Sequence, residues 1–386
     1  VYEMQKKMGA HFGLNFGWEH PLWFAAEGEP EAETYGFTRQ NWWEPVGREV
    51  KMLRTNAGIL DISNFAKYRV KGPGAEDWLN ALFANRMPRV VGRSCLTPLI
   101  GKRGGVAGDF TVTRLAEDEF WVVGSGMAER FHLRFFRTIP LPDATTFESL
   151  TESVAGFNVA GPRSRELLGR LTNADLTNEG FAFMRSRRIS VAGVDCVAIR
   201  VSFTGDLGWE LHCAEGDQVA LYTALLEAGK ELGAGPVGGR ALMSMRLEKG
   251  YGSWGRDYSP EYWPHESGLG GLIKRDKDFL NKSAWEAIAD KPARETMVLL
   301  EIDALEADAS GSEPIFATDG KPIGQVSSGA YGYYVGKSLA LAYLKAGSAA
   351  PGDTVHVAIL GQPHTARVLE RPPFDPDGVR LRDKAG

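Results

Sequence analysis

The chain has 386 residues, enough for about two or three domains, and its 43% apolar and 24% charged content is typical of a soluble globular protein. Its net charge of −5 gives no electrostatic reason to expect binding to nucleic acid or to an anionic membrane. No apolar run approaches the ~18 residues of a membrane span, and the N-terminus lacks the apolar region of a signal peptide. We therefore expect a cytoplasmic protein, or one of the mitochondrial matrix if the source is a eukaryote.

The cysteines and histidines predict neither a metal site nor a disulfide framework. The three cysteines are odd in number, lie far apart and form no CxxC pair, and the seven histidines include no pair four residues apart. A reducing compartment fits this pattern. Because the chain begins with Val1 rather than Met, we expect a processed product or a fragment of something longer.

The first 45 residues are irregular and rich in aromatic side chains. FGWEHPLWF occupies positions 16–24, and NWWEP occupies 41–45. An exposed tail would not carry so many Trp and Phe residues, so we expect this segment to pack onto the body of the protein or to line a pocket.

The next elements alternate in the order of a ferredoxin-like unit. A helix is expected over 44–58, with Val46, Val50 and Leu53 on one face and Gly58 as its stop. The elements expected after it are strands at 58–63 and 66–73, a helix at 74–84, a strand hairpin at 109–115 and 119–126, and a helix at 128–139.

The same order then recurs, followed by a β-rich segment. The expected elements are a strand within 147–162, a helix at 164–171, two strands about Gly193 within 187–203, and an amphipathic helix at 217–233. The core candidates of that last helix are Val219, Leu221, Leu225 and Leu226. Short strands separated by Gly and Pro turns follow a boundary at 291–295 and predict a small β-barrel or jelly-roll-like domain.

GKRGGVAGDFTV, at 101–112, sets four glycines around one carboxylate. Gly104 and Gly105 fit a hairpin turn, and Asp109 fits the polar residue of an edge strand. The alternative is that Asp109 faces a small molecule, which the glycines allow the backbone to approach closely.

Motifs for nucleotides and for a serine nucleophile are missing. The chain contains no GxxxxGK[ST] and no GxSxG. Its two GxGxxG matches, GAGPVG at 233–238 and GYGSWG at 250–255, each follow an expected helix and not a strand, so neither fits a dinucleotide-binding turn. GLGGLIK at 268–274 fits a packing turn better than a phosphate loop. If the protein is an enzyme, we expect a bound organic cofactor to supply its chemistry.

Two later segments carry further candidates. In RVSFTGDLGWELH, at 200–212, Glu210 follows a glycine-bracketed turn and could accept two adjacent N–H donors of a flat heterocycle such as a pterin, with Phe203 at the ring face. Spacing alone favours a salt-bridged glutamate in a hairpin. In MRLEKGYGSWGRD, at 245–257, Glu248 and Lys249 fit a solvated or structural pair, and Trp254 fits core or pocket wall equally well.

Taken in order, these segments resemble the folate-binding aminomethyltransferase family, which includes the T-protein of the glycine cleavage system. The resemblance is closer to the C-terminal half of dimethylglycine and sarcosine dehydrogenases and oxidases and covers about residues 10–380. The motifs that carry it are FGWEHPLWF, VGREV, GILDIS, FTGDLGWELH, MRLEKGYGSWGRD and ILGQPHTARVL.

The resemblance implies an α+β fold of three domains in a ring around a channel for tetrahydrofolate. Two ferredoxin-like units would be joined by the C-terminal β-barrel or jelly-roll-like domain. The implied domains are a discontinuous first one, 1–54 with 145–290, a second one, 55–144, that carries the glycine-rich loop, and a third one, 291–386.

The resemblance also implies roles for individual residues. Asp109 would lie near the bridge nitrogen of the folate and remove or orient its proton as the nitrogen attacks an iminium or methylene carbon. Glu210 would hold the pterin, the remaining pocket residues would be Phe65, Thr111, Ser125, Phe203 and Trp254, and no metal is implied.

Three departures point away from a glycine cleavage protein itself. Gly108 replaces the first of two loop aspartates, Phe203 replaces a tyrosine, and Ser125 replaces an asparagine. Phe203 lacks the hydroxyl group of the tyrosine, and the last two departures affect positions that make individual hydrogen bonds to folate in the family.

The implied function is tetrahydrofolate-dependent transfer of a methylene group from an N-methyl amine such as dimethylglycine or sarcosine. No FAD is expected in this chain, because it lacks a dinucleotide fingerprint, so a flavin domain or subunit is the expected partner. One alternative is a stand-alone demethylase that transfers a methyl group directly, from dimethylsulfoniopropionate or methoxylated aromatics. Another is a non-catalytic folate-binding protein, whose relatives carry a cysteine in the stretch corresponding to EKGYGSWGRD; this chain has none there.

Overall fold

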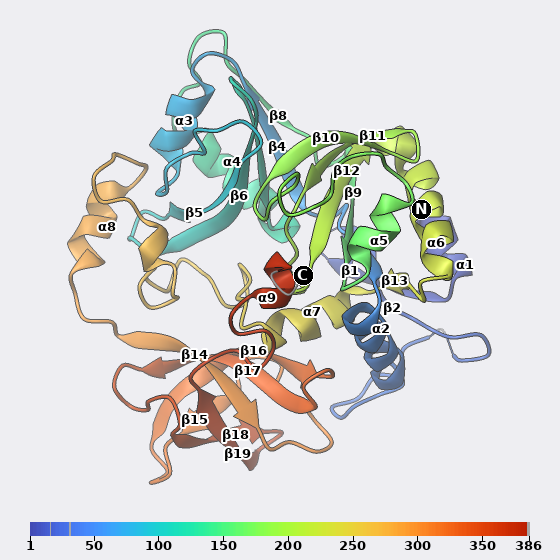
Figure 1. The fold of residues 1–386 in the computed structure, drawn as a ribbon. Coiled ribbons are helices and arrows are strands. Elements are labelled where there is room, and N and C mark those ends of the chain that lie inside the picture. Colours follow the sequence, from blue (N-terminus) through green and yellow to red (C-terminus); the bar gives the residue numbers. More distant parts are fainter. Residues whose placement is uncertain (16, 31, 384–386) are drawn as a thin grey trace.

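The computed structural model describes residues 1–15, 17–30 and 32–383. Figure 1 shows three sheet units arranged around a central region in which α9 (Val379–Arg382) lies. The expected α+β class with a C-terminal barrel is confirmed. No helix in the described part of the chain combines the length and the apolarity that a membrane span requires.

The first unit is a five-stranded antiparallel sheet of order β5-β6-β7-β4-β8. Its strands are β4 (Ala66–Lys71), β5 (Ser94–Ile100), β6 (Val106–Ala116), β7 (Glu119–Gly124) and β8 (Thr146–Ser149). The helices α3 (Ala75–Leu82) and α4 (Glu129–Phe136), with the short turn η1 (Gly126–Ala128), complete it. The order is ferredoxin-like, with β5 added at an edge.

Strand β5 was not predicted, and its sequence explains why. SCLTPLI has no clean apolar alternation and contains Pro98, which cannot donate a hydrogen bond to a sheet. An edge strand tolerates this residue, because only one side of the strand is paired.

The second unit is a six-stranded sheet of order β10-β11-β12-β9-β3-β13. Its strands are β3 (Gly58–Asp61), β9 (Val154–Ala160), β10 (Ser186–Val191), β11 (Val194–Ile199), β12 (Gly208–Ala214) and β13 (Gly235–Val237). Ile59 packs into the core under α5 (Ser164–Gly169) and α6 (Gln218–Lys230), whereas Leu60 packs into the core under α2 (Trp43–Thr55) and α7 (Gly239–Glu248). This sheet is therefore buried on both faces.

The prediction of the core residues of α6 was partly wrong. Leu221 and Leu225 are fully buried and Leu226 is partly buried, but Val219 is 49% exposed and Tyr222 takes an inward position instead. The helix begins at Gln218, after the turn η2 (Glu215–Asp217), and its buried residues are Leu221, Tyr222, Leu225 and Gly229.

The third unit is a closed barrel of order β14-β17-β16-β15-β18-β19. Its strands are β14 (Glu295–Ile302), β15 (Pro314–Phe316), β16 (Pro322–Gly332), β17 (Lys337–Lys345), β18 (Thr354–Ile359) and β19 (Gln362–Leu369). Pairing of β14 with both β17 and β19 closes it and leaves no exposed edge.

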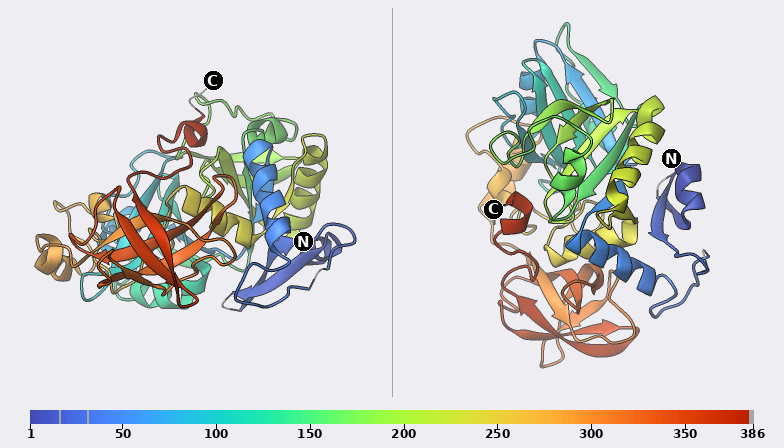
Figure 2. Two further views of the ribbon diagram at one scale, coloured as in Figure 1. Left: turned by 90° about the horizontal axis from the view of Figure 1, so that it is seen from below. Right: turned by 45° about the vertical axis from the view of Figure 1, so that its right-hand side comes forward.

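The aromatic N-terminus forms α1 (Tyr2–Lys7) and a hairpin of β1 (Ala10–Asn15) and β2 (Trp18–Phe24). In Figure 2 this hairpin lies at the edge of the molecule. Trp23 is fully buried as expected, whereas Tyr35 and Phe37 of the following loop are 86% and 88% exposed. Phe16, part of the expected aromatic run, lies outside the described residues.

The predicted domains, 1–54 with 145–290, 55–144 and 291–386, remain a prediction. For three segments, however, the observed packing assigns the segment to a different unit from the one that these limits give. Strand β3 pairs with β9 and so belongs to the six-stranded sheet, and β8 pairs with β4 and so belongs to the five-stranded one. The turn η3 (Gly270–Leu272) leads to α8 (Lys282–Ala289), whose Trp285 packs with Ile100 beside the five-stranded sheet.

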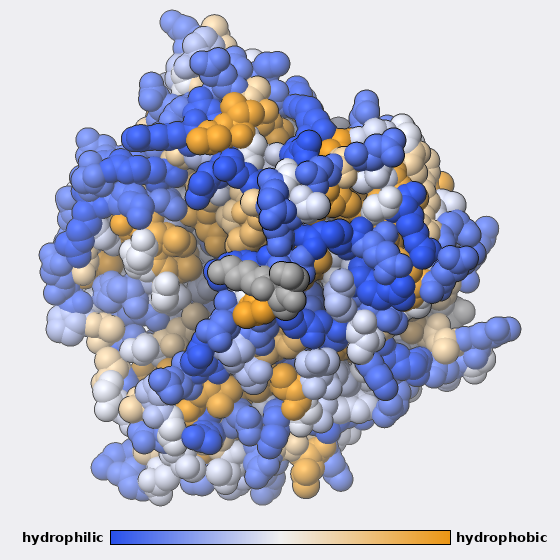
Figure 3. Space-filling view, in the orientation of Figure 1, coloured by the Kyte–Doolittle hydropathy of each residue, from blue (hydrophilic) through white to orange (hydrophobic). Residues whose placement is uncertain are grey.

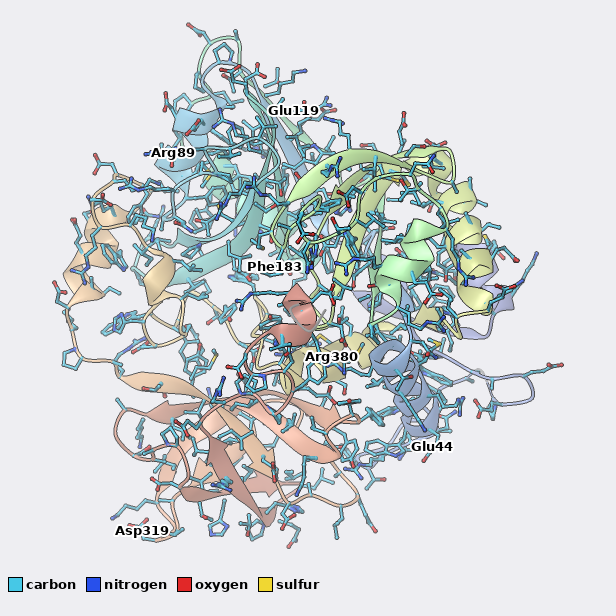
Figure 4. The ribbon with its side chains drawn as sticks, viewed as in Figure 1. Glu44, Arg89, Glu119, Phe183, Asp319 and Arg380 are labelled. Atoms are coloured by element: carbon cyan, nitrogen blue, oxygen red, sulfur yellow. The ribbon has the colours of Figure 1, made fainter. Side chains whose placement is uncertain are left out.

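A buried ion-pair network joins the units at the centre of the molecule. Arg54 at the end of α2 contacts Asp206 at 2.6 Å and Glu248 at 2.7 Å, and all three side chains are buried. Arg380 of α9 contacts the other oxygen of Asp206 at 2.8 Å. Figure 4 places Arg380 and Phe183 centrally, whereas Glu44, Arg89, Glu119 and Asp319 lie toward the outside.

We expect Arg54→Met to lower the free energy of unfolding by about 3–5 kcal/mol, because Glu248 would stay buried without its counter-ion. Urea unfolding followed by circular dichroism measures the change. Arg69→Met is the matched control, since it breaks a solvent-exposed pair with Glu148 at 2.6 Å and is expected to cost less than about 1 kcal/mol. Equal, small losses in the two variants would contradict the structural role of the network.

Candidate active site

One cavity of about 1220 Å³ lies between the three units. Figure 3 shows that the viewed face is hollowed, with apolar side chains on the walls of the hollow. The residues predicted from the sequence all line this cavity: Phe65, Asp109, Thr111, Ser125, Phe203, Glu210 and Trp254. The fold thus brings together side chains from both large sheets and from the loop after α7.

Asp109 lies on β6, which is an inner strand between β5 and β7 and not an edge strand. Side chains alternate along a strand, so Asp109 and Thr111 face the cavity while Phe110 packs in the core of the five-stranded unit. The hairpin interpretation of the preceding turn is correct, because β5 and β6 are antiparallel and their pairing ends at Ile100 and Val106.

The glycines before Asp109 make room for protein and not for a ligand, which corrects the sequence-based interpretation. A Cβ atom at Gly105 would lie 2.1 Å from the carbonyl oxygen of Pro260, and one at Gly104 would lie 2.8 Å from that of Ala284. A Cβ atom at Gly108 would lie 2.8 Å from Nε2 of the buried His132. Close packing of the 260–288 segment against this loop therefore requires the glycines.

The surroundings of Asp109 favour its neutral form. Burial raises the pKa of its carboxyl group to about 6, and the charge of Asp257 adds to this. Asp257 is itself compensated, since it pairs with Arg246 at 2.7 Å and accepts hydrogen bonds from the hydroxyl groups of Ser327 and Ser328 at 2.6 Å each. Asp109 can therefore take up and release a proton near neutral pH.

Glu210 projects from β12 and is 12% exposed. Among the described residues no Lys or Arg forms an ion pair with it, which argues against the salt-bridged hairpin that spacing alone favours. The titratable side chain that does contact Glu210 is His212, whose Nε2 lies 3.5 Å from a carboxylate oxygen of Glu210.

Lys67, which sequence reasoning missed, lies buried near these groups. Its Nζ donates to the carbonyl oxygens of Ser63 and Phe65 at 2.8 Å each and so fixes the turn that carries Phe65. Burial lowers the pKa of Lys67 to about 8, against the opposing charges of Asp61, Glu210 and Glu129. The alternation in AKYRVK predicts an exposed lysine, so no local signal could have found it.

Aromatic rings form other parts of the wall. The rings of Phe203 and Tyr251 are nearly parallel with centroids 6.0 Å apart. Trp254 is a wall residue and also donates from Nε1 to the carbonyl oxygen of Val106 at 3.3 Å, which ties its loop to the strand of Asp109. Ser125 follows β7 at the start of η1.

The expected pairing of Glu248 with Lys249 was wrong. Both side chains are buried rather than solvated, and each has another partner. Glu248 of α7 pairs with Arg54 of α2, and Lys249 pairs with Asp375 at 2.9 Å, so the first pair joins two helices and the second holds the C-terminal segment next to α7. In the part of the chain that the structure describes, no cluster of His, Cys, Asp and Glu side chains could hold a metal ion.

Comparison with known proteins places these features in a family. Residues 1–277 match the family model described as GCVT N-terminal domain, and residues 296–375 match the glycine cleavage T-protein C-terminal barrel domain. A solved structure of the glycine cleavage system aminomethyltransferase T from Bartonella henselae has the same fold, with a TM-score of 0.84 and 24% identity over 97% of each chain.

Two curated relatives show the range of the family. The chain is 34% identical over 380 residues to the mitochondrial dimethylglycine dehydrogenase of Homo sapiens, covering 97% of this chain and 44% of that one. It is 30% identical over 384 residues to an aminomethyltransferase of Saccharopolyspora erythraea, covering 96% of each. The chain thus spans about half the length of the dehydrogenases that it matches. It belongs to the folate-dependent aminomethyltransferase family of the glycine cleavage T-protein.

Proposed function

We propose that this enzyme transfers a methylene group to tetrahydrofolate from an N-methyl amine such as dimethylglycine or sarcosine. The observation that carries the proposal is the joint placement of Asp109 and Glu210, from two different sheets, in the wall of one cavity of about 1220 Å³. The identity of 34% to a dimethylglycine dehydrogenase supports the amine as the class of donor.

The residues present fit tetrahydrofolate. Glu210 faces the cavity, and no Lys or Arg of residues 1–15, 17–30 and 32–383 pairs with it, so its two oxygens can accept the paired N–H donors of a pterin edge. Phe65, Phe203 and Trp254 offer flat apolar faces to the heterocycle and to the ring that follows it. Thr111 and Ser125 contribute hydroxyl groups to the same wall.

Tetrahydrofolate, when bound, supplies the nucleophilic nitrogen that receives the carbon. Asp109 would act as the general base, because its carboxylate is ionised at neutral pH yet basic enough, at a pKa of about 6, to accept a proton from that nitrogen. The inner position of β6 holds the carboxylate rigidly, and the enclosed cavity limits competing reaction of the one-carbon unit with water.

The amine must be oxidised before a methylene group can be transferred, and we propose that a flavin dehydrogenase domain or subunit does this. The chain contains no dinucleotide fingerprint, and the dehydrogenases that it matches are about twice as long. The compartment is proposed to be the cytoplasm, or the mitochondrial matrix if the source is a eukaryote.

We expect tetrahydrofolate to stabilise the protein by about 2.7 kcal/mol at a ligand concentration of 100 times Kd. Thermal denaturation with and without ligand measures this, and p-aminobenzoylglutamate, which lacks the pterin, is the control ligand with a smaller expected effect. No stabilisation by tetrahydrofolate would contradict the proposal.

Mass spectrometry of the folate product separates the two transfer chemistries. With dimethylglycine and a flavin dehydrogenase present, we expect methylene-tetrahydrofolate. Methyl-tetrahydrofolate formed without any flavoprotein would favour the direct demethylase instead.

A further inference from the structure

His212 is a buried histidine whose two ring nitrogens find no hydrogen-bond partner among the residues that the structure describes. Its side chain has no solvent exposure, and within the described part of the chain neither Nδ1 nor Nε2 has a partner within hydrogen-bond geometry. An unsatisfied buried donor or acceptor costs stability, and such groups in folded proteins call for an explanation.

The pocket that holds this imidazole is built around it. Gly156 lies directly opposite His212 in the pairing of β9 with β12, and a Cβ atom at Gly156 would lie 2.9 Å from Nδ1. The ring of Trp121 contacts the imidazole edge-on, with centroids 5.7 Å apart. Strand β9 therefore leaves room for the ring by having a glycine at this position.

The remaining side of the imidazole faces Glu210. Residues two apart on a strand share a face, so His212 lies on the same face of β12 as Glu210. Glu210 lines the cavity whereas His212 does not, so the imidazole stands behind the carboxylate. The distance of 3.5 Å from Nε2 to the carboxylate oxygen is only slightly longer than an ordinary hydrogen bond, so a small rotation of Glu210 would complete it.

We propose that His212 is a positioning residue for Glu210. Its Nε2–H donates to the carboxylate of Glu210 and holds that carboxylate in the plane in which it can accept two N–H donors from the edge of a heterocycle. This inference rests on the proposed function, because it assumes that Glu210 binds the pterin. A carboxylate that accepts two parallel N–H donors must have a fixed plane. A hydrogen bond from the imidazole, on the side away from the cavity, would fix the plane of the Glu210 carboxylate. Nδ1, which remains without a partner among the described residues, is then a cost to stability that the binding site requires.

Two variants separate a hydrogen-bonding role from a packing role. His212→Leu is apolar and similar in volume, whereas His212→Gln keeps an N–H near the position of Nε2. We expect His212→Leu to weaken tetrahydrofolate binding about tenfold, and His212→Gln to stay within about threefold of the wild type. Because the leucine removes unsatisfied groups, the ligand-free His212→Leu protein should melt no lower than the wild type.

Coupling to Glu210 is the decisive readout, since a merely structural residue would not show it. In a Glu210→Gln background, His212→Leu is expected to change Kd by less than about twofold, because the carboxylate it would position is gone. Isothermal titration calorimetry with tetrahydrofolate measures all four proteins of this cycle. Equal losses in the Leu and Gln variants, or an undiminished loss in the Glu210→Gln background, would overturn the inference.

The outcomes also separate this inference from the proposed function. A wild-type protein that does not bind tetrahydrofolate overturns both. A wild-type protein that binds tetrahydrofolate, with an unchanged Kd in His212→Leu, overturns the role of His212 alone.

Discussion

Asp109→Asn is expected to lower kcat for one-carbon transfer by about 10²–10⁴-fold while leaving the Kd of tetrahydrofolate within about threefold. The asparagine keeps the shape of the side chain in the cavity wall but cannot accept the proton of the attacking nitrogen. Single-turnover transfer at saturating folate measures the effect. Asp195→Asn, which changes an exposed aspartate on β11, is the matched control and should leave kcat unchanged.

The pH dependence of the same variant gives a second readout. Because burial raises the pKa of Asp109 to about 6, wild-type kcat should fall as the pH drops through about 6, and Asp109→Asn should lose this inflection. An inflection that persists unchanged in the variant would assign the proton transfer to another group.

Stability should change in the opposite direction to activity. The pKa of Asp109 is higher in the folded state than the ordinary aspartate value of 3.8, so its ionisation costs stability above about pH 4 and the full cost is present above about pH 6. We therefore expect Asp109→Asn to raise the free energy of unfolding by about 1–3 kcal/mol at pH 8 and to leave it unchanged at pH 4.

Glu210→Gln is expected to weaken tetrahydrofolate binding at least about 30-fold. The amide has one acceptor oxygen in place of two, and its N–H₂ group would oppose a donor of the heterocycle edge. Titration calorimetry measures the loss, and Glu215→Gln, on the exposed turn η2, is the control. Binding of wild-type strength in Glu210→Gln would remove Glu210 from the site.

Local elements with strong periodicity could be predicted from the sequence. The expected helix at 44–58 is observed as Trp43–Thr55, because its apolar spacing defines the buried face; the expected stop at Gly58 was wrong, since the helix ends at Thr55 and Gly58 begins β3. Strand β5 and helix α8 were not found, since neither carries a clear periodic pattern. The positions of β3 and β8 in their sheets depend on pairing between distant segments, which local patterns do not encode.

The candidate site was found through ordered motifs and not through spacing alone. Glu210 in isolation fits a hairpin, and the glycines before Asp109 suggest space for a ligand where the structure has packed backbone. The buried charged groups around the site were missed, because their neighbours are brought to them by the tertiary fold and not by the local sequence. Lys67 reads as a surface lysine, and Asp257 meets Ser327 and Ser328 only because the barrel folds back against the loop after α7.

The most direct test of the central claim is a crystal structure of this chain with tetrahydrofolate bound. We expect the pterin edge to donate two hydrogen bonds to the carboxylate of Glu210, and a nitrogen of the bridge to lie within about 3.2 Å of the carboxylate of Asp109. A folate molecule bound outside the cavity, or bound inside it with neither carboxylate in contact, would contradict the proposed site.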